Sequence, residues 1–220
     1  MKLNKGLLII TSCLSLLAAN SAYSQDVQIR YSSLYGKLKN NLKEGHEDVN
    51  IRLYLVDQQG NTCKIHKASM RKDKHYEDLV IPADYALSIP LDSNLRQANP
   101  DVTFVIDEGI TCDVSMQILG LNYKPNSLSK EYIASIVPQM NVMMTDLGGM
   151  FSNWFMPKAE GVVVTLSDPN VDQTIVLENG KTISFIEGIG KIKPDDLSAN
   201  ETLRFTQSIE KISPWIPAKS

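Results

Sequence analysis

The sequence contains few of the residues on which metal sites and many enzyme active sites depend. Its 220 residues include three histidines, three cysteines and two tryptophans. His46, His66 and His75 lack the four-residue helical spacing, or another compact spacing, that zinc sites use. The pattern therefore predicts no metal site, and a site that the fold gathers from all three histidines is the alternative. We expect His46, which follows a glycine, and His75, in a charged segment, to be exposed to solvent.

The sequence also lacks the short motifs that mark common catalytic machinery. It has no Gly-x-Ser-x-Gly nucleophile elbow, no Ser-x-x-Lys with its companion motifs and no glycine-rich phosphate loop. Aspartate and glutamate are plentiful, with 25 residues, but a catalytic carboxylate pair is recognised by its separation in space. The sequence therefore predicts no catalytic residue and no cofactor, and enzyme function has no positive support.

The N-terminus has the three parts of a secretory signal. Two lysines precede a mostly apolar run over residues 6–19, and small residues follow at Ala22 and Ser24. A membrane-spanning helix needs about 20 apolar residues, so this run is too short for a permanent anchor. We predict a cleaved signal peptide over residues 1–24, a mature chain that starts near Gln25 without a transmembrane segment, and a periplasmic location.

Lipidation of Cys13 is the alternative. Residues 10–13 resemble a lipoprotein box, in which the cysteine carries lipid and tethers the protein to a membrane. The apolar run continues past Cys13 through Leu14, Leu16 and Leu17. A lipobox cysteine normally ends the apolar region, so the pattern favours the cleaved signal.

Removal of the predicted signal leaves 196 of the 220 residues, enough for one medium domain or two small ones. Lys2 and Lys5 leave with the signal and no acid does, so the formal net charge falls from −3 to −5. Nucleic acids and anionic membranes are bound by basic surfaces. The composition therefore predicts no nucleic-acid partner.

Cys63 and Cys112 are the two cysteines of the predicted mature chain. Two cysteines in an oxidising compartment usually form a disulfide, and closing a loop of roughly 50 residues would stabilise the fold by about 4 kcal/mol. A redox-active pair is the alternative, but it lacks the Cys-x-x-Cys spacing. We predict a structural disulfide between Cys63 and Cys112.

Hydrophobic periodicity predicts the elements of the first part of the chain. Apolar residues recur every three or four positions over residues 30–43, which indicates an amphipathic helix. Alternating segments predict two antiparallel pairs of strands. The pairs are 49–55 with 62–67 and 102–106 with 112–119. Residues 92–100 are polar and contain a proline, and we expect a long ordered loop there.

The remaining chain predicts a central helix and a β-rich end. The helix is expected over residues 129–147, with a kink or break at Pro138. Asn179-Gly180 is a strong hairpin signal. Predicted strands are 161–166, 173–177, 181–186, 188–192 and 202–206, and the C-terminus, with two prolines, is expected to be extended.

These elements predict an α+β fold class: an antiparallel sheet with an N-terminal helix and a kinked central helix, followed by a small all-β region. The expected domains are residues 25–128, with the disulfide, a helical segment and connector over 129–157, and a β domain over 158–220. Because the last region has no cysteine, we expect it to depend on its own core.

Methionines and aromatic residues concentrate between residues 140 and 156. Helical spacing makes core packing the simplest interpretation of the methionines. The alternative is an adaptable apolar groove that accepts a lipid-like or peptide partner beside Phe151, Trp154 and Phe155. The residues in question are Met140, Met143, Met144, Met150 and Met156.

Four strings of the sequence together resemble a known family. They are LKNNLKEGH at 38–46, HYE at 75–77, DSNLRQANP at 92–100 and LGGMFSNWF at 147–155. The family is a group of exported gammaproteobacterial proteins known as domain of unknown function 2987, and the likeness covers nearly the whole mature chain. The resemblance implies a periplasmic or envelope setting, and it implies no activity, cofactor or catalytic residue.

The leading hypothesis is a non-catalytic envelope protein that binds another envelope protein or an apolar ligand. The candidate binding surfaces are the segment 92–100 and the connector 150–156. The candidate residues are Asp92, Asn94, Arg96, Phe151 and Trp154. The alternative is a hydrolase that acts on cell-envelope material, for which Asp92, Asn94 and Arg96 would have to converge with a buried acid in one cleft.

Overall fold

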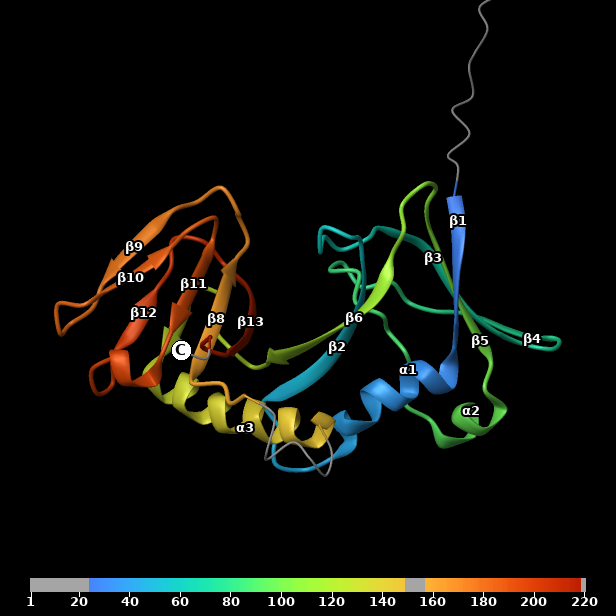
Figure 1. Ribbon diagram of the computed structural model, residues 1–220, viewed down its shortest axis with the longest axis horizontal. Helices are drawn as coiled ribbons and strands as arrows, with labels where there is room; N and C mark the ends of the chain where they lie inside the picture. Colours follow the sequence, from blue (N-terminus) through green and yellow to red (C-terminus); the bar gives the residue numbers. More distant parts are fainter. Residues whose placement is uncertain (1–23, 149–156, 219–220) are drawn as a thin grey trace, which may run out of the picture.

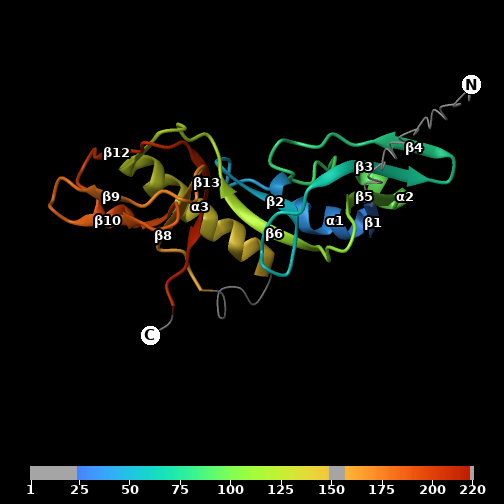
Figure 2. The same cartoon turned by 90° about the horizontal axis from the view of Figure 1, so that it is seen from above.

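The computed structural model describes residues 24–148 and 157–218. It shows an elongated α+β molecule, as the sequence predicts, with two β-rich lobes (Figures 1 and 2). A two-stranded ladder and a long helix run between the lobes and connect them (Figure 1). Among the residues that the structure describes, no helix is long and apolar enough to cross a membrane.

The N-terminal lobe is built on an antiparallel sheet with the strand order β1-β5-β3-β4. The strands are β1 (Ser24–Arg30), β3 (Ile65–Lys72), β4 (His75–Asp78) and β5 (Asp101–Asp107). The sequence pattern did not predict β1, because this edge strand turns only Val27 and Ile29 toward the core. Two helices complete the lobe, α1 (Tyr31–Leu38), which continues as the 3-10 turn η1 (Lys39–Leu42), and α2 (Ser93–Ala98).

The ladder between the lobes pairs β2 (Val49–Val56) with β6 (Asp113–Gly120) along eight residues of each strand. The two predicted hairpins are therefore wrong, because β3 pairs with β5 and β2 pairs with β6. The turn after β2 exists, since Cys63 N donates to Leu55 O at 2.8 Å, but the chain then crosses to the other sheet. Alternation shows which face of a strand is buried and does not identify its partner.

The predicted disulfide is present between Cys63 and Cys112, whose Cα atoms are 6.6 Å apart. Cys63 lies two residues before β3, and Cys112 directly precedes β6. Both cysteines are buried. The bond therefore joins the four-stranded sheet to the ladder at the point where the chain passes between them.

Helix α3 (Lys130–Gly148) runs along one side of the molecule, from beneath the C-terminal lobe to the ladder (Figure 1). The helix continues through Pro138. Met140, Met143 and Met144 are buried in the core, as the simplest interpretation of the methionines predicts. The other predicted methionines, Met150 and Met156, lie outside the described residues.

The C-terminal lobe contains a three-stranded antiparallel sheet in the order β11-β8-β13 and two two-stranded sheets, β9 with β10 and β7 with β12. Its strands are β7 (Ser127–Ser129), β8 (Gly161–Leu166), β9 (Gln173–Val176), β10 (Thr182–Phe185), β11 (Ile189–Ile192), β12 (Thr202–Arg204) and β13 (Ile209–Trp215), with the 3-10 turn η3 (Pro194–Asp196) after β11. The predicted β9–β10 hairpin is confirmed. Its loop closes through Gly180 N, which donates to Leu177 O at 2.9 Å, and Gly180 has the positive φ of 82° that favours glycine.

Buried apolar side chains from both lobes form one continuous cluster. Phe104 belongs to the N-terminal sheet, Met140 to α3 and Val164 to β8, and all three are members of this cluster. In addition, β7, which spans the predicted boundary at residue 128, pairs with β12 of the last predicted domain. The domain boundaries at residues 128 and 157 stay a prediction.

Candidate functional site

The segment 92–100 is a short helix with its caps, so the prediction of a loop was wrong. The Asp92 carboxylate accepts hydrogen bonds from Asn94 N at 2.6 Å and Leu95 N at 3.0 Å, the arrangement of a helix N-cap. Asn99 ends the helix in the left-handed conformation, with φ 49°. The available sequence signal was an aspartate at a possible N-cap, with Asn99 and Pro100 at the other end of the segment.

The three candidate residues of this segment do not converge on a cleft. Asp92 binds the backbone of α2, and the Arg96 guanidinium lies 5.7 Å from the centre of the Tyr35 ring. Asn94 is exposed. These contacts explain Asp92 and Arg96 as stabilisers of the α1–α2 corner. The other two candidates, Phe151 and Trp154, lie outside the described residues.

The histidines lie in three different places. His46 is 3% exposed, so the expectation of an exposed side chain was wrong, and its Nε2 has no hydrogen-bond partner among the described residues. His66 Nε2 lies 2.6 Å from the Asp107 carboxylate on the N-terminal sheet. His75 is exposed on β4, as predicted. In the described ranges, no three histidine, cysteine, aspartate or glutamate residues are grouped as metal ligands.

A polar pocket lies on the outer face of the ladder, where the C-terminal lobe meets it. Its volume is about 260 Å³. The walls come from both ladder strands, the segments after β2 and after β6, the segment before α2, and β13. The lining residues are Arg52, Tyr54, Thr62, Asp84, Gln117, Leu119, Gly120, Leu121, Asn122, Tyr123, Glu210 and Lys211. We define this set as the inter-lobe pocket.

Strand pairing positions the polar groups on the ladder side of the pocket. Arg52 is directly opposite Gln117 in the β2–β6 register, so their side chains share one face. Tyr54 is two residues further along β2 on that face. The opposite face carries Ile51 and Leu53, which are buried in the core. Alternate side chains of β2 therefore point into the core and into the pocket.

The polar groups of this wall bind one another. Arg52 Nη1 lies 2.6 Å from Asp84 Oδ2, and the Tyr54 hydroxyl donates to the same carboxylate oxygen at 3.2 Å. Burial, together with the nearby Asp84 carboxylate and against the opposing effect of the Arg52 cation, raises the pKa of Tyr54 to about 12. The phenol therefore keeps its proton at neutral pH and acts as a hydrogen-bond donor.

The opposite wall connects the ladder to the C-terminal lobe. The Tyr123 hydroxyl donates to the backbone carbonyl of Glu210 on β13 at 2.9 Å, and burial raises the pKa of Tyr123. Asn122 has a positive φ of 58° and donates from its side chain to the Asp48 carboxylate at 2.9 Å. These bonds fix residues 122 and 123 at the junction of the lobes.

The pocket continues into a smaller hollow of about 190 Å³ that also contains Asn122 and Tyr123. The Tyr132 hydroxyl, on α3, donates to Leu121 O at 2.5 Å beside this hollow. Burial raises the pKa of Tyr132. Asn122 and Tyr123 therefore line both hollows, and tyrosine and amide groups recur in the two linings.

Sequence reasoning missed the inter-lobe pocket. Arg52 and Tyr54 were visible as polar and aromatic positions on the outer face of a predicted strand. Asp84 and Glu210 come from segments 126 residues apart in the numbering, and no local pattern connects them. The sequence therefore indicated only the ladder wall of the pocket, through Arg52 and Tyr54.

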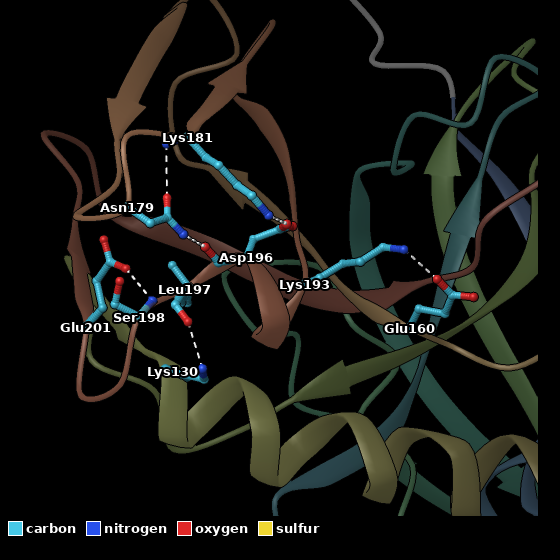
Figure 3. A network of polar contacts seen from close by, with 9 residues as sticks. All are labelled: Lys130, Glu160, Asn179, Lys181, Lys193, Asp196, Leu197, Ser198 and Glu201. Carbon is cyan, nitrogen blue, oxygen red and sulfur yellow. Dashed lines mark hydrogen bonds and ion pairs between the residues drawn. The ribbon is translucent and has the colours of Figure 1, made fainter.

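A second polar network holds the C-terminal lobe together (Figure 3). Glu201 is buried, and its carboxylate accepts hydrogen bonds from Ser198 N at 2.7 Å and Glu178 N at 2.8 Å. Lys130, at the start of α3, donates from Nζ to Leu197 O at 2.7 Å. These partners are backbone groups of loops, so this network stabilises the loops of the C-terminal lobe.

Comparison with known proteins identifies the family. The model of DUF2987, described as a protein of unknown function, matches residues 23–166. No curated protein and no solved structure matches the chain. The matched range contains all the inter-lobe pocket except Glu210 and Lys211. Because the match covers more than half of the 220 residues, the chain belongs to the DUF2987 family.

Proposed function

We propose that this protein is an exported, non-catalytic binding module of the bacterial cell envelope that holds a polar segment of a partner protein in the inter-lobe pocket. The observation that carries the proposal is the composition of the pocket. Two cationic and two anionic residues line it, Arg52, Lys211, Asp84 and Glu210. A charge-balanced lining with amide and phenol groups suits the neutral, hydrogen-bonding backbone of a polypeptide better than an apolar ligand.

The same lining supports binding rather than hydrolysis. Its described residues include no histidine, serine or cysteine, so a hydrolase at this pocket would depend on the carboxylates of Asp84 and Glu210. The Asp84 carboxylate is engaged by Arg52 and Tyr54. Groups that already satisfy one another form a pre-organised binding surface, so these side chains lose less conformational entropy when a partner binds.

Two features support an exported setting. The predicted signal peptide over residues 1–24 would direct the chain out of the cytoplasm. The Cys63–Cys112 disulfide is typical of proteins that fold in an oxidising compartment. Cell fractionation with N-terminal sequencing tests this part of the proposal: a periplasmic product that starts near Gln25 supports it, and a lipid-modified Cys13 contradicts it.

Site-specific photocrosslinking in the native envelope tests the binding part. A photoreactive amino acid at Gln117 would lie in the pocket, whereas the same group at exposed Lys37 on α1 would lie away from it. We expect a reproducible adduct from position 117 and none from position 37. The same adduct from both positions, or no adduct from position 117, would contradict the proposal.

A matched pair of arginine variants then connects the adduct to the pocket chemistry. Arg52→Met removes the guanidinium that holds Asp84, whereas Arg71→Met removes an exposed guanidinium from β3. We expect Arg52→Met to lose the adduct at position 117 and Arg71→Met to keep it. Circular dichroism of both variants confirms that each is folded.

A further inference from the structure

Strand β1 forms one of the two edges of the N-terminal sheet, whose order is β1-β5-β3-β4. The other edge strand, β4, is only four residues long. In contrast, β1 pairs with β5 along all seven of its residues, without a shift in register. Proteins commonly protect a sheet edge by a short edge strand, a β-bulge or a proline. β1 has none of these, so its outer side is the longer template for another strand.

The strand register shows which backbone groups of β1 face outward. In an antiparallel pair, residues that bond to the neighbouring strand alternate with residues whose backbone groups point to the other side. Tyr31 N donates to Pro100 O at 3.0 Å, in the same register as the β1–β5 pairing. The odd-numbered residues of β1 therefore bond to β5, and the backbone groups of Asp26, Gln28 and Arg30 point away from the sheet.

Most of these outward groups are free. The Arg30 carbonyl stands at the N-cap of α1, where it accepts the first bond of the helix. Among the described residues, no strand other than β5 pairs with β1, and no hydrogen bond from a loop reaches the N–H and C=O groups of Asp26 and Gln28. The side chains of all three residues are exposed. A strand laid along this edge would therefore meet unpaired N–H and C=O groups.

The edge has opposite charges at its two ends. Asp26 makes no ion pair with a described residue. The Arg30 side chain is 59% exposed, and its Nη1 lies 3.0 Å from Asp101 Oδ1 on β5, so the guanidinium keeps donors for a second carboxylate. The first turn of α1, next to Arg30, contains no acidic residue, and the positive end of the helix dipole adds to the charge of Arg30. The edge thus favours a basic residue opposite Asp26 and an acidic residue opposite Arg30.

The other face of β1 carries the apolar residues of the strand. Val27 and Ile29 alternate with the outward residues and are partly buried against the core. In an added strand, the side chains directly opposite these two would lie on the same face. Apolar side chains there would extend the core beyond β1 and cover the surface that Val27 and Ile29 leave exposed.

A second copy of the chain is one candidate for the added strand, because β1 itself reads acidic, apolar, polar, apolar, basic from Asp26 to Arg30. If Asp26 paired with Arg30 of the second copy, that copy's α1, which begins directly after β1, would start beside Gln25. This place is taken, since Gln25 Nε2 donates to Ile110 O in the loop before β6. Figure 1 shows α1 at one end of β1 and this loop near the other. A short segment of a different protein fits between the two.

We propose that the free edge of β1 binds a five-residue extended segment of a partner protein, which adds as an antiparallel strand. The segment begins with an acidic residue opposite Arg30, ends with a basic residue opposite Asp26 and has apolar residues at its second and fourth positions. Backbone hydrogen bonds supply affinity, and the alternating side chains supply specificity, as in other cases of strand addition. All pairs of strands in this sheet are antiparallel, which favours this direction. The inference uses residues apart from the inter-lobe pocket and does not rest on the function proposed for it.

Two synthetic peptides test the charge pattern. One has the core Glu-Val-Thr-Val-Lys, and the other has the core Lys-Val-Thr-Val-Lys, which places a cation opposite Arg30. NMR titration of the whole protein should show that the first peptide binds roughly fivefold more tightly, because like charges directly opposite each other repel. Its binding should slow hydrogen exchange of the Asp26 and Gln28 amides on the order of tenfold or more, since these amides would become hydrogen-bonded. Equal affinities, or amides that stay unprotected, would contradict the proposal.

Charge reversal at one end of the edge makes the test specific. Asp26→Lys changes an exposed side chain and should switch the preference, by roughly fivefold, to a peptide with the core Glu-Val-Thr-Val-Glu. Glu77→Lys makes the same change on β4, at the other edge of the sheet, and should keep the original preference. An unchanged preference in Asp26→Lys would overturn the proposal.

A proline at the centre of the edge removes one backbone donor. Gln28→Pro deletes an N–H that the pairing with β5 does not use, and edge positions tolerate proline for that reason. The variant should fold and bind the first peptide roughly tenfold more weakly. Sedimentation velocity of the native protein completes the test, because a dimer that Gln28→Pro abolishes would refute the proposed partner and identify a second copy as the occupant.

Discussion

The two lobes are held together by different kinds of interaction. In the N-terminal lobe a covalent bond between Cys63 and Cys112 joins the sheet to the ladder. In the C-terminal lobe, which has no cysteine, the carboxylate of Glu201 joins two loops through backbone hydrogen bonds. A disulfide limits the unfolded chain, whereas a buried carboxylate acts only in the folded state. The two lobes should therefore respond to different perturbations, and four experiments test this difference.

Removal of the disulfide should have the largest effect. The double variant Cys63→Ala with Cys112→Ala frees a loop of roughly 50 residues, so the free energy of unfolding should fall by about 4 kcal/mol. Urea denaturation measures the total loss, and hydrogen exchange assigns it to a region. We expect β3, β5 and β6 to lose more protection than β8 and β13. Equal loss in both lobes would mean that they unfold as one unit, which the continuous core permits.

Substitution of Glu201 should have the next largest effect and should fall on the other lobe. Glu201→Ala leaves the buried amides of Glu178 and Ser198 without an acceptor, which should cost about 2 to 3 kcal/mol of the free energy of unfolding. Glu201→Gln keeps one acceptor oxygen and should cost less. Thermal unfolding combined with hydrogen exchange of β9 and β12 checks both variants, and no loss of stability in Glu201→Ala would show that the carboxylate is dispensable.

A matched pair of glycine variants compares packing in the two lobes. A Cβ at Gly190 would meet the buried Phe185 ring at 2.5 Å, whereas a Cβ at Gly36, in α1, would have nothing within 4 Å. Gly190→Ala should therefore destabilise by about 1 to 3 kcal/mol through overpacking. Gly36→Ala should stabilise by about 0.5 to 1 kcal/mol, because alanine favours helix. Denaturant midpoints measure both, and a neutral Gly190→Ala would show that Phe185 can move.

Acidification should have the smallest effect, at the junction of the lobes. Hydrogen bonds from the side chains of Asn122 and Gln139 hold the pKa of Asp48 below its ordinary value of 3.8. A lowered pKa in the folded state stabilises above the ordinary value, and this stabilisation is lost as the pH falls below about 4. Melting temperatures across this range should fall less in Asn122→Ala than in the native protein. Parallel curves for the two proteins would exclude this contribution.

The sequence predicted the helices and strands better than it predicted which strands pair. The strand over residues 49–55 was visible because Ile51 and Leu53 alternate with polar residues, but three strands of the four-stranded sheet, β3, β4 and β5, lie between it and its partner β6 in the chain. Local turns were visible where glycine marks them, as in the β9–β10 loop. Which strands pair depends on contacts between residues far apart in the sequence, and hydrophobic periodicity carries no information about those contacts.

The candidate site shows the same limit. The predicted residues Asp92 and Arg96 stood out because they are polar and close together in the sequence, yet they stabilise a helix corner. The inter-lobe pocket joins residues whose positions in the sequence are far apart, such as Arg52 and Glu210. Residues that are close in the sequence led to the N-cap of α2, whereas the inter-lobe pocket could be found only from the fold.

The pairing of β13 with β8 also determines when the C-terminal sheet can form as the chain emerges. A chain that emerges from its N-terminus, whether from a ribosome or a membrane channel, presents the N-terminal sheet, the disulfide and the ladder first. The middle strand β8 then has one neighbour, β11, until residues 209–215 arrive. Glu210 and Lys211 are on β13, so the inter-lobe pocket is complete only after residues 209–215 have emerged. A partner that recognises the full pocket would therefore not bind a chain in which β13 has yet to pair with β8.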